Sequence, residues 1–197
     1  MNRRLFLALP GLLATPALAQ GQSPTAVVEG FHAALIDIMR NAQRLGVRGR
    51  LQRIAPVMGQ AFNLPAMTRI AVGPPWSGFS PAQQQALVQA FSDWSVATYA
   101  NRFDGFGGES FETLGENEVG RDRMVRTRLN RPREEAVQLN YLMRNADGGW
   151  RVVDVYLTGT ISELASRRAE FTNVLREGGP ERLVAELQQR TANLLRG

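Results

Sequence analysis

Apolar residues near the start of the chain recur at the spacing of a helix. Ser23 is a typical N-cap residue, and Pro24 follows it in the first turn, where a missing N–H costs no hydrogen bond. The apolar stripe behind them fits one helical face and comprises Val27, Val28, Phe31, Leu35, Ile38 and Met39. The pattern therefore predicts that the first helix begins at Pro24.

Further helices are expected in the first half of the chain, at about residues 48–58, 63–72 and 80–99. The second of these starts near Asn63 and stops before the break at 73–75, which reads Gly-Pro-Pro. The third starts at a capping box made by Ser80 and Gln83. Its apolar side consists of Leu87, Val88, Phe91 and Trp94.

After Phe103 the apolar period changes from that of a helix to that of a strand. Alternating runs occupy residues 111–114, 123–129, 136–143 and 150–157. Turn-rich connectors separate them at 115–117, 130–132 and 145–149. Connectors this short require antiparallel neighbours. The sequence therefore predicts a four-stranded antiparallel meander.

Two helical stretches close the chain, at 162–177 and 180–195, with Gly178 and Gly179 between them. Thr160 and Glu163 have the spacing of a capping box at the first. A sheet covered on its concave side by helices is an α+β architecture. We expect an N-terminal helical half, the sheet, two C-terminal helices, and an apolar cavity between the two layers.

The first residues have the pattern of an export signal. Arg3 and Arg4 precede a short apolar run, and residues 17–19 read Ala-Leu-Ala. The arginine pair fits a twin-arginine signal and equally an ordinary secretory signal. We therefore expect a signal peptide at 1–19, a periplasmic protein, and a single domain at 20–197.

Composition narrows the chemistry. Cysteine is absent, which removes disulfides, thiolate nucleophiles and cysteine zinc sites together. No window approaches the ~18 consecutive apolar residues of a membrane span. The chain has 23 basic residues, all arginine, against 18 acidic ones, for a formal net charge of +5. No cofactor and no metal is expected.

Arginines concentrate on the predicted hairpin at 121–133, where they are Arg121, Arg123, Arg126, Arg128, Arg131 and Arg133. Nucleic acid is a poor partner for an exported protein, and no aromatic residues interleave with these arginines. Anionic lipid headgroups or an acidic protein fit better, and a solvated strand face fits equally well.

Three segments, in this order and spacing, resemble the MlaC-type ("toluene-tolerance") family of periplasmic phospholipid carriers. They are Asn63–Met67 with Val72–Gly73, Ser80–Gln84 through Phe91 to Tyr99, and Trp150–Val155 followed by Gly159, Phe171, Leu175, Gly179, Leu183 and Leu187. The stretch 158–162 departs from the common family pattern. Together with residues 104–106, it is more similar to the hopanoid-associated, HpnM-like branch.

The resemblance implies an NTF2/cystatin-like fold with a cavity that holds acyl chains and leaves the headgroup outside. It implies a shuttle for phospholipid, or for a polycyclic lipid such as a hopanoid, between the inner and outer membranes. The partners that it implies are an MCE-type inner-membrane transporter and an outer-membrane lipoprotein/porin complex.

Apolar residues on the predicted helices and strands are the candidates for contact with the lipid, although each alone fits plain core as well. They are Phe31, Leu35, Met67, Phe91, Trp94, Val125, Leu139, Tyr141, Val153, Val155, Leu164, Phe171 and Leu175. Trp76, in a Gly/Pro-rich loop, is placed either at the cavity mouth or as an anchor of the loop on the core. Met58 and Met143 are further flexible side chains that suit variable contents.

Two other functions remain open from the sequence. One is a small NTF2-like cavity enzyme that uses Asp154 as a base, with Tyr141 or Tyr156 as an oxyanion donor. It requires a buried carboxylate that faces the cavity with a raised pKa; the alternative is that Asp154 caps a helix or pairs with an arginine. His32, the only histidine, is expected to be partly exposed on its helix. The other function is an envelope adaptor that binds protein through the arginine-rich hairpin.

Overall fold

The computed structural model describes residues 22–146 and 148–196. The predicted signal peptide at 1–19 lies outside these residues. Within the described part of the chain, no helix has the length and apolar character needed to cross a bilayer.

The first half of the described chain is helical, as predicted. It comprises α1 (Pro24–Arg40), α2 (Ala42–Ala61), α3 (Leu64–Val72), a short 3-10 helix η1 (Pro74–Gly78) and α4 (Pro81–Arg102). The predicted caps are present, because Ser23 accepts from Ala26 N and Ser80 forms the capping box with Gln83. α2 begins earlier than predicted, and Gly46, at φ +60°, interrupts it.

The second half forms a single antiparallel sheet. Its strands are β1 (Ser110–Val119), β2 (Asp122–Arg131), β3 (Glu134–Ala146), β4 (Gly149–Leu157) and β5 (Ile161–Ser162), in the order β1-β2-β3-β4-β5. The predicted meander is confirmed, but it has five strands rather than four. The extra strand β5 has two residues, paired with Tyr156 and Leu157. A run this short contains no alternation that a sequence pattern could reveal.

The predicted turn at 115–117 is wrong. β1 continues to Val119, and Gly115, at φ +139°, lies where the register with β2 shifts. A glycine in an apolar alternation marks a bulge as readily as a turn. The chain instead reverses at Gly120, between β1 and β2.

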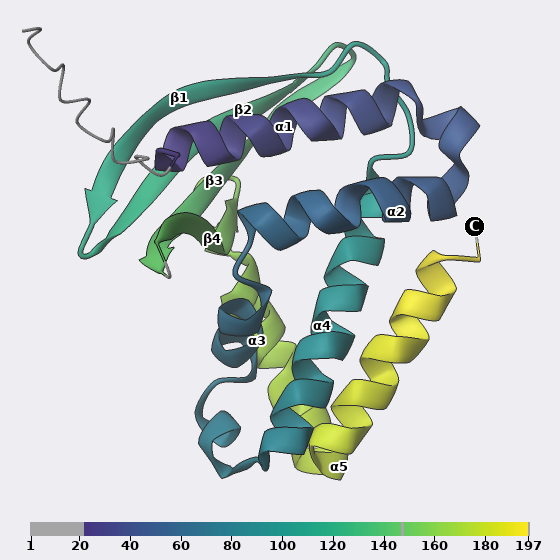
Figure 1. Ribbon diagram of the computed structural model, residues 1–197, viewed down its shortest axis with the longest axis vertical. Coiled ribbons are helices and arrows are strands. Elements are labelled where there is room, and N and C mark those ends of the chain that lie inside the picture. Colours follow the sequence, from purple (N-terminus) through teal and green to yellow (C-terminus); the bar gives the residue numbers. More distant parts are fainter. Residues whose placement is uncertain (1–21, 147, 197) are drawn as a thin grey trace, which may run out of the picture.

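The two predicted C-terminal helices are the halves of one labelled element, α5 (Glu163–Leu194), which is broken at Gly178 and Gly179. Gly179 has φ +69°, a conformation that favours glycine. The halves run in nearly opposite directions beside α4 (Figure 1). Arg190 of the second half forms an ion pair with Glu170 of the first, so the fold-back is held by charge as well as by the break.

The helices lie on one side of the curved sheet (Figure 1), with α1 running along it and α4 packing against α2 and α5. Asn63 N donates to Val152 O at 2.9 Å, which ties the α2–α3 junction to β4. The core lies between the layers, and its largest fully buried side chains include Phe31, Leu35, Ile54, Met58, Tyr141 and Phe171.

Candidate functional site

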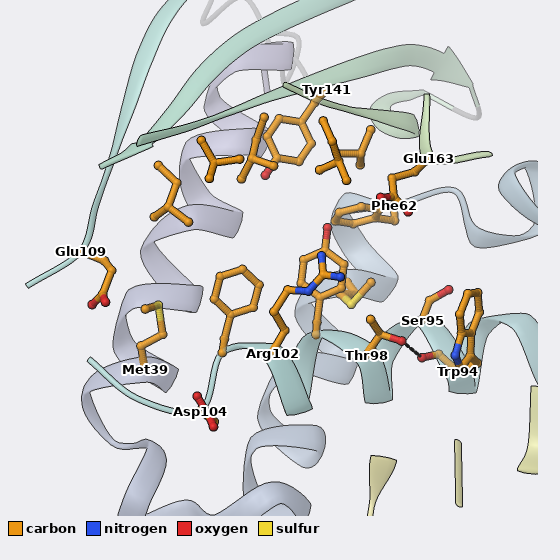
Figure 2. Close-up of a pocket in the computed structure, with 18 of the residues that line it drawn as sticks. Met39, Phe62, Trp94, Ser95, Thr98, Arg102, Asp104, Glu109, Tyr141 and Glu163 are labelled. Carbon is orange, nitrogen blue, oxygen red and sulfur yellow. Dashed lines mark hydrogen bonds between the residues drawn. The ribbon is translucent and has the colours of Figure 1, made fainter. Parts of the chain in front are cut away.

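A cavity of about 710 Å³ separates part of the sheet from the helices. Its size falls within the roughly 300–1,000 Å³ of small-molecule sites. Most of its wall is apolar and is formed by Met39, Met58, Phe62, Leu64, Met67, Phe91, Trp94, Tyr99, Phe103, Phe106, Leu129, Val137, Leu139, Tyr141, Val155, Leu157 and Leu164. Figure 2 shows these walls converging from the sheet and from the helices.

Strand alternation explains the sheet side of the wall. Leu139 and Tyr141 share one face of β3 because side chains two residues apart point the same way. In the register with β4, Leu139 lies opposite Leu157 and Tyr141 opposite Val155. Cross-strand neighbours on one face lie side by side, so these four side chains form a continuous apolar surface.

Polar and charged residues also line the cavity. Figure 2 shows Asp104 and Glu109 on one side, Glu163 and Trp94 on the other, and Arg102 between them. Glu163 pairs with Arg167 at 3.3 Å, and the Arg167 guanidinium lies 4.7 Å from the centre of the Trp94 ring. The wall of the cavity is therefore mostly apolar, with charged groups among its lining residues.

Half of the predicted lipid-contact residues line the cavity, and these are Met67, Phe91, Trp94, Leu139, Tyr141, Val155 and Leu164. The others do not, and these are Phe31, Leu35, Trp76, Val125, Val153, Phe171 and Leu175. Five of the second group are buried core residues with exposures of 2% or less, namely Phe31, Leu35, Val125, Val153 and Phe171. Trp76 and Leu175 are partly buried and pack against that core, so Trp76 is a loop anchor rather than part of the mouth.

Simple two-residue alternation predicted the wrong position for Val153. Met143 pairs with Val152 and Leu142 with Asp154, so Val153 is an extra residue in β4. This bulge breaks the two-residue period that grouped Val153 with Val155. The third methionine suggested for the cavity, Met143, is also fully buried away from it.

The sequence did not predict several α4 residues that line the cavity. Ser95, Thr98 and Arg102 continue the i+3/i+4 spacing that starts at Phe91. The spacing could have predicted these positions, but their side chains are polar, so an apolar stripe alone did not include them. Ser95 and Thr98 donate to the carbonyls of Phe91 and Trp94 at 2.7 and 2.8 Å, so their own helix satisfies their hydroxyls.

Asp154 does not line the cavity. It is buried, and desolvation raises the pKa of its carboxyl group. Its Oδ2 accepts from Ser162 Oγ at 2.6 Å and its Oδ1 from Leu164 N at 3.3 Å, so it binds β4 to the start of α5. The capping alternative is confirmed, and the geometry required of a base is absent.

The start of α5 also differs from the predicted Thr160–Glu163 capping box. Ser162 is the N-cap residue, and its side chain accepts from Ala165 N. Glu163 lies in the first turn, lines the cavity and pairs with Arg167.

The prediction of a partly exposed His32 is wrong. The side chain is 4% exposed, its Nε2 lies 2.9 Å from the Tyr141 hydroxyl, and its ring stacks on Phe111. Burial lowers the pKa of His32 to about 3. Among residues 22–146 and 148–196, no cluster of three His, Cys, Asp or Glu side chains could hold a metal.

Several arginines of the β2 hairpin are already paired within the protein. Arg123 pairs with Glu118 at 2.6 Å, and Arg128 pairs with Glu112 at 2.7 Å. Arg131 lines the cavity and pairs with Glu134. These contacts neutralise part of the positive surface on which an adaptor function depends.

Comparisons with known proteins agree with this architecture. Residues 29–189 match the model of a family described as MlaC protein. No curated protein matches the sequence. A similar solved structure is that of the phospholipid-binding protein from Ralstonia solanacearum in complex with a phospholipid. It is 23% identical, with a TM-score of 0.77, and the alignment covers 88% of this chain and 99% of that chain. At this identity the likeness shows the fold.

Proposed function

Because this chain belongs to the MlaC protein family, we propose that it carries a phospholipid or hopanoid-like lipid between the inner and outer membranes. The observation that carries the proposal is the apolar cavity of about 710 Å³ between sheet and helices. The phospholipid in the Ralstonia solanacearum protein of similar fold supports the same ligand class.

The physical chemistry of the cavity suits a carrier. Burial of acyl chains gains ~0.8 kcal/mol per CH₂, so a long chain binds tightly without directed contacts. Met39, Met58 and Met67 line the space, and their flexible side chains adapt to chains of different length and saturation. Tight binding of this kind requires a partner, or an opening of the cavity, for release.

Location and partners follow from the same proposal. The charged residues, apolar run and Ala-Leu-Ala site at the N-terminus support export to the periplasm. There the carrier would exchange lipid with an MCE-type transporter of the inner membrane and a lipoprotein/porin complex of the outer membrane. Family membership supports these partners.

We propose binding rather than catalysis as the activity. The carboxylate suggested as a base, Asp154, is turned to the N-terminus of α5 and does not line the cavity. The hydroxyl of Tyr141, suggested as an oxyanion donor, is bonded to His32. Neither group is available to a ligand in this arrangement.

Native mass spectrometry of the mature protein, residues 20–197, followed by organic extraction, tests the proposal. Discrete lipid adducts are expected, and their masses distinguish phospholipid from hopanoid. The delipidated protein should then take up lipid from vesicles and deliver it to acceptor vesicles. A protein that carries no lipid and takes none up would overturn the proposal.

A further inference from the structure

The hydroxyl groups that line the cavity differ in whether another group of the protein hydrogen-bonds them. Those of Ser95, Thr98 and Thr158 donate to backbone carbonyls within 2.8 Å, and that of Tyr141 bonds His32 at 2.9 Å. No group among the described residues hydrogen-bonds the hydroxyl of Tyr99, whose pKa is raised by burial. Tyr99 therefore presents a protonated, unused donor inside an apolar space.

The ring of Tyr99 is held firmly. It packs edge-on against Phe31 and Phe62, with ring centres 5.6 and 5.9 Å apart, and stacks on Phe103 at 5.6 Å. The Tyr99 hydroxyl is not among the fully buried side-chain atoms of the described residues that have no partner, so its oxygen is accessible from the cavity and to a ligand there. Because the ring is packed on three sides, the position of the hydroxyl oxygen is fixed.

The arginines that line the cavity differ in whether a carboxylate of the protein pairs with them. Arg131 pairs with Glu134, and Arg167 pairs with Glu163 at 3.3 Å. Arg102 lines the same space and, in the described part of the chain, has no carboxylate within 4.0 Å of its nitrogens. Its charge acts on Tyr99, which lies one helical turn earlier on the same face of α4.

Arg102 is exposed, so it stands where the cavity opens to water. Figure 2 shows its guanidinium turned among the lining side chains, while Asp104 and Glu109 lie to one side. A donor within the cavity and a cation at its opening, one turn apart, match an ester carbonyl and a phosphate that are a few bonds apart in one molecule.

We propose that Tyr99 and Arg102 select ester-linked glycerophospholipids, with the Tyr99 hydroxyl donating to an acyl ester carbonyl and Arg102 pairing with the adjacent phosphate. The inference rests on the proposed function and assigns two selectivity residues to the same cavity. A polycyclic hydrocarbon lipid without an ester satisfies neither group. The acyl chains supply most of the affinity, and these two residues supply the selectivity.

The test offers delipidated protein an equimolar mixture of dioleoylphosphatidylglycerol, its dioleyl ether analogue and dioleoylglycerol. Lipid retained is then counted by mass spectrometry. The wild type should prefer the ester to the ether, and the phospholipid to the diacylglycerol, each by roughly three- to tenfold. Tyr99→Phe should abolish the first preference alone, and Arg102→Gln the second alone.

Matched controls are Tyr156→Phe and Arg176→Gln, which lie outside the cavity and should keep both preferences. Thermal unfolding of each variant verifies its fold. A wild type that retains all three lipids without preference, or a Tyr99→Phe variant that still prefers the ester, overturns the inference and leaves the carrier function standing. A wild type that retains none of them overturns the carrier function itself.

Discussion

Nε2 of His32 and the hydroxyl oxygen of Tyr141 lie 2.9 Å apart in the buried layer between α1 and β3. The bond joins residues 109 positions apart in the sequence and fixes a tyrosine whose ring forms part of the cavity wall. It also removes the Tyr141 hydroxyl from contact with a ligand. The same pair places the one titratable imidazole of the chain in a dry environment.

The first prediction concerns acid stability. The pKa of His32 falls from 6.5 to about 3 on folding, so between these values the unfolded chain binds more protons than the folded protein. The contribution of His32 is fully present above pH 6.5 and is lost as the pH falls toward 3, by up to about 1.4 kcal/mol per pH unit. Urea unfolding of the wild type between pH 7 and 4 measures it.

His32→Gln is the reference for this measurement, because glutamine bonds the Tyr141 hydroxyl but does not titrate. The variant should lose less stability on acidification than the wild type. The raised pKa of Asp154 acts in the opposite direction, since its contribution is lost as the pH rises, but it is common to both proteins and cancels in the difference. Parallel pH profiles would contradict the assignment.

Asp154 is predicted to stabilise the contact between β4 and the start of α5. Asp154→Ala leaves Ser162 Oγ and Leu164 N without their carboxylate partner, which should lower the free energy of unfolding by about 1–3 kcal/mol. Lipid loading at temperatures well below unfolding should not change. Asp93→Ala, at an exposed position of α4, is the control and should cost little. A loss of lipid binding in the folded variant would show that Asp154 acts on the ligand.

Filling the cavity should shorten the lipid that fits. Thr98 lines the space from α4, and Thr98→Phe places a ring where acyl carbons are proposed to lie. Excluding two or three methylenes costs ~2 kcal/mol at ~0.8 kcal/mol each, so the variant should retain shorter chains than the wild type. Lipidomics of the purified proteins measures the shift. Gln85→Phe, on the exposed side of the same helix, should leave the chain-length distribution unchanged.

Arg50 is predicted to hold α2 to the end of α4. Its guanidinium is buried and donates to Ala100 O at 2.7 Å and to Ala42 O at 3.2 Å. Arg50→Met keeps the stem but leaves these carbonyls unpaired, at a cost of about 1–3 kcal/mol in chemical unfolding. Arg50→Lys should recover part of it, because an ammonium lacks the planar fork that reaches both carbonyls.

Exposed Arg48 provides the comparison for that measurement, and Arg48→Met should change stability by less than about 0.5 kcal/mol. Equal losses at the two positions would mean that the carbonyl contacts of Arg50 contribute nothing specific.

The sequence predicted the elements well, because their signals are local. The caps at Ser23 and Ser80, and the break at Gly178 and Gly179, depend on residues a few positions apart, and all are present. The errors occur where a local signal fits two structures or where an element is too short to have a signal. Glycine at 115 indicated a turn but forms a bulge, and β5 is too short to have a pattern.

The candidate site was predictable only in part. An apolar stripe shows which side of an element is buried, and Phe31 and Phe91 both satisfy that test. Both are 2% exposed, but Phe91 also lines the cavity and Phe31 does not, because distant elements close over one and leave a space beside the other. No periodicity distinguishes a packed wall from an open one.

By itself, the sequence determined the helices, the antiparallel meander and the resemblance to its family, since capping, alternation and short connectors act between near neighbours. Only the tertiary structure decided that His32 is buried against Tyr141, that Asp154 closes on α5, and that Tyr99 has a free hydroxyl in the cavity. The reason is physical: a side chain's burial, pKa and unused hydrogen bonds depend on groups brought to it from distant parts of the chain.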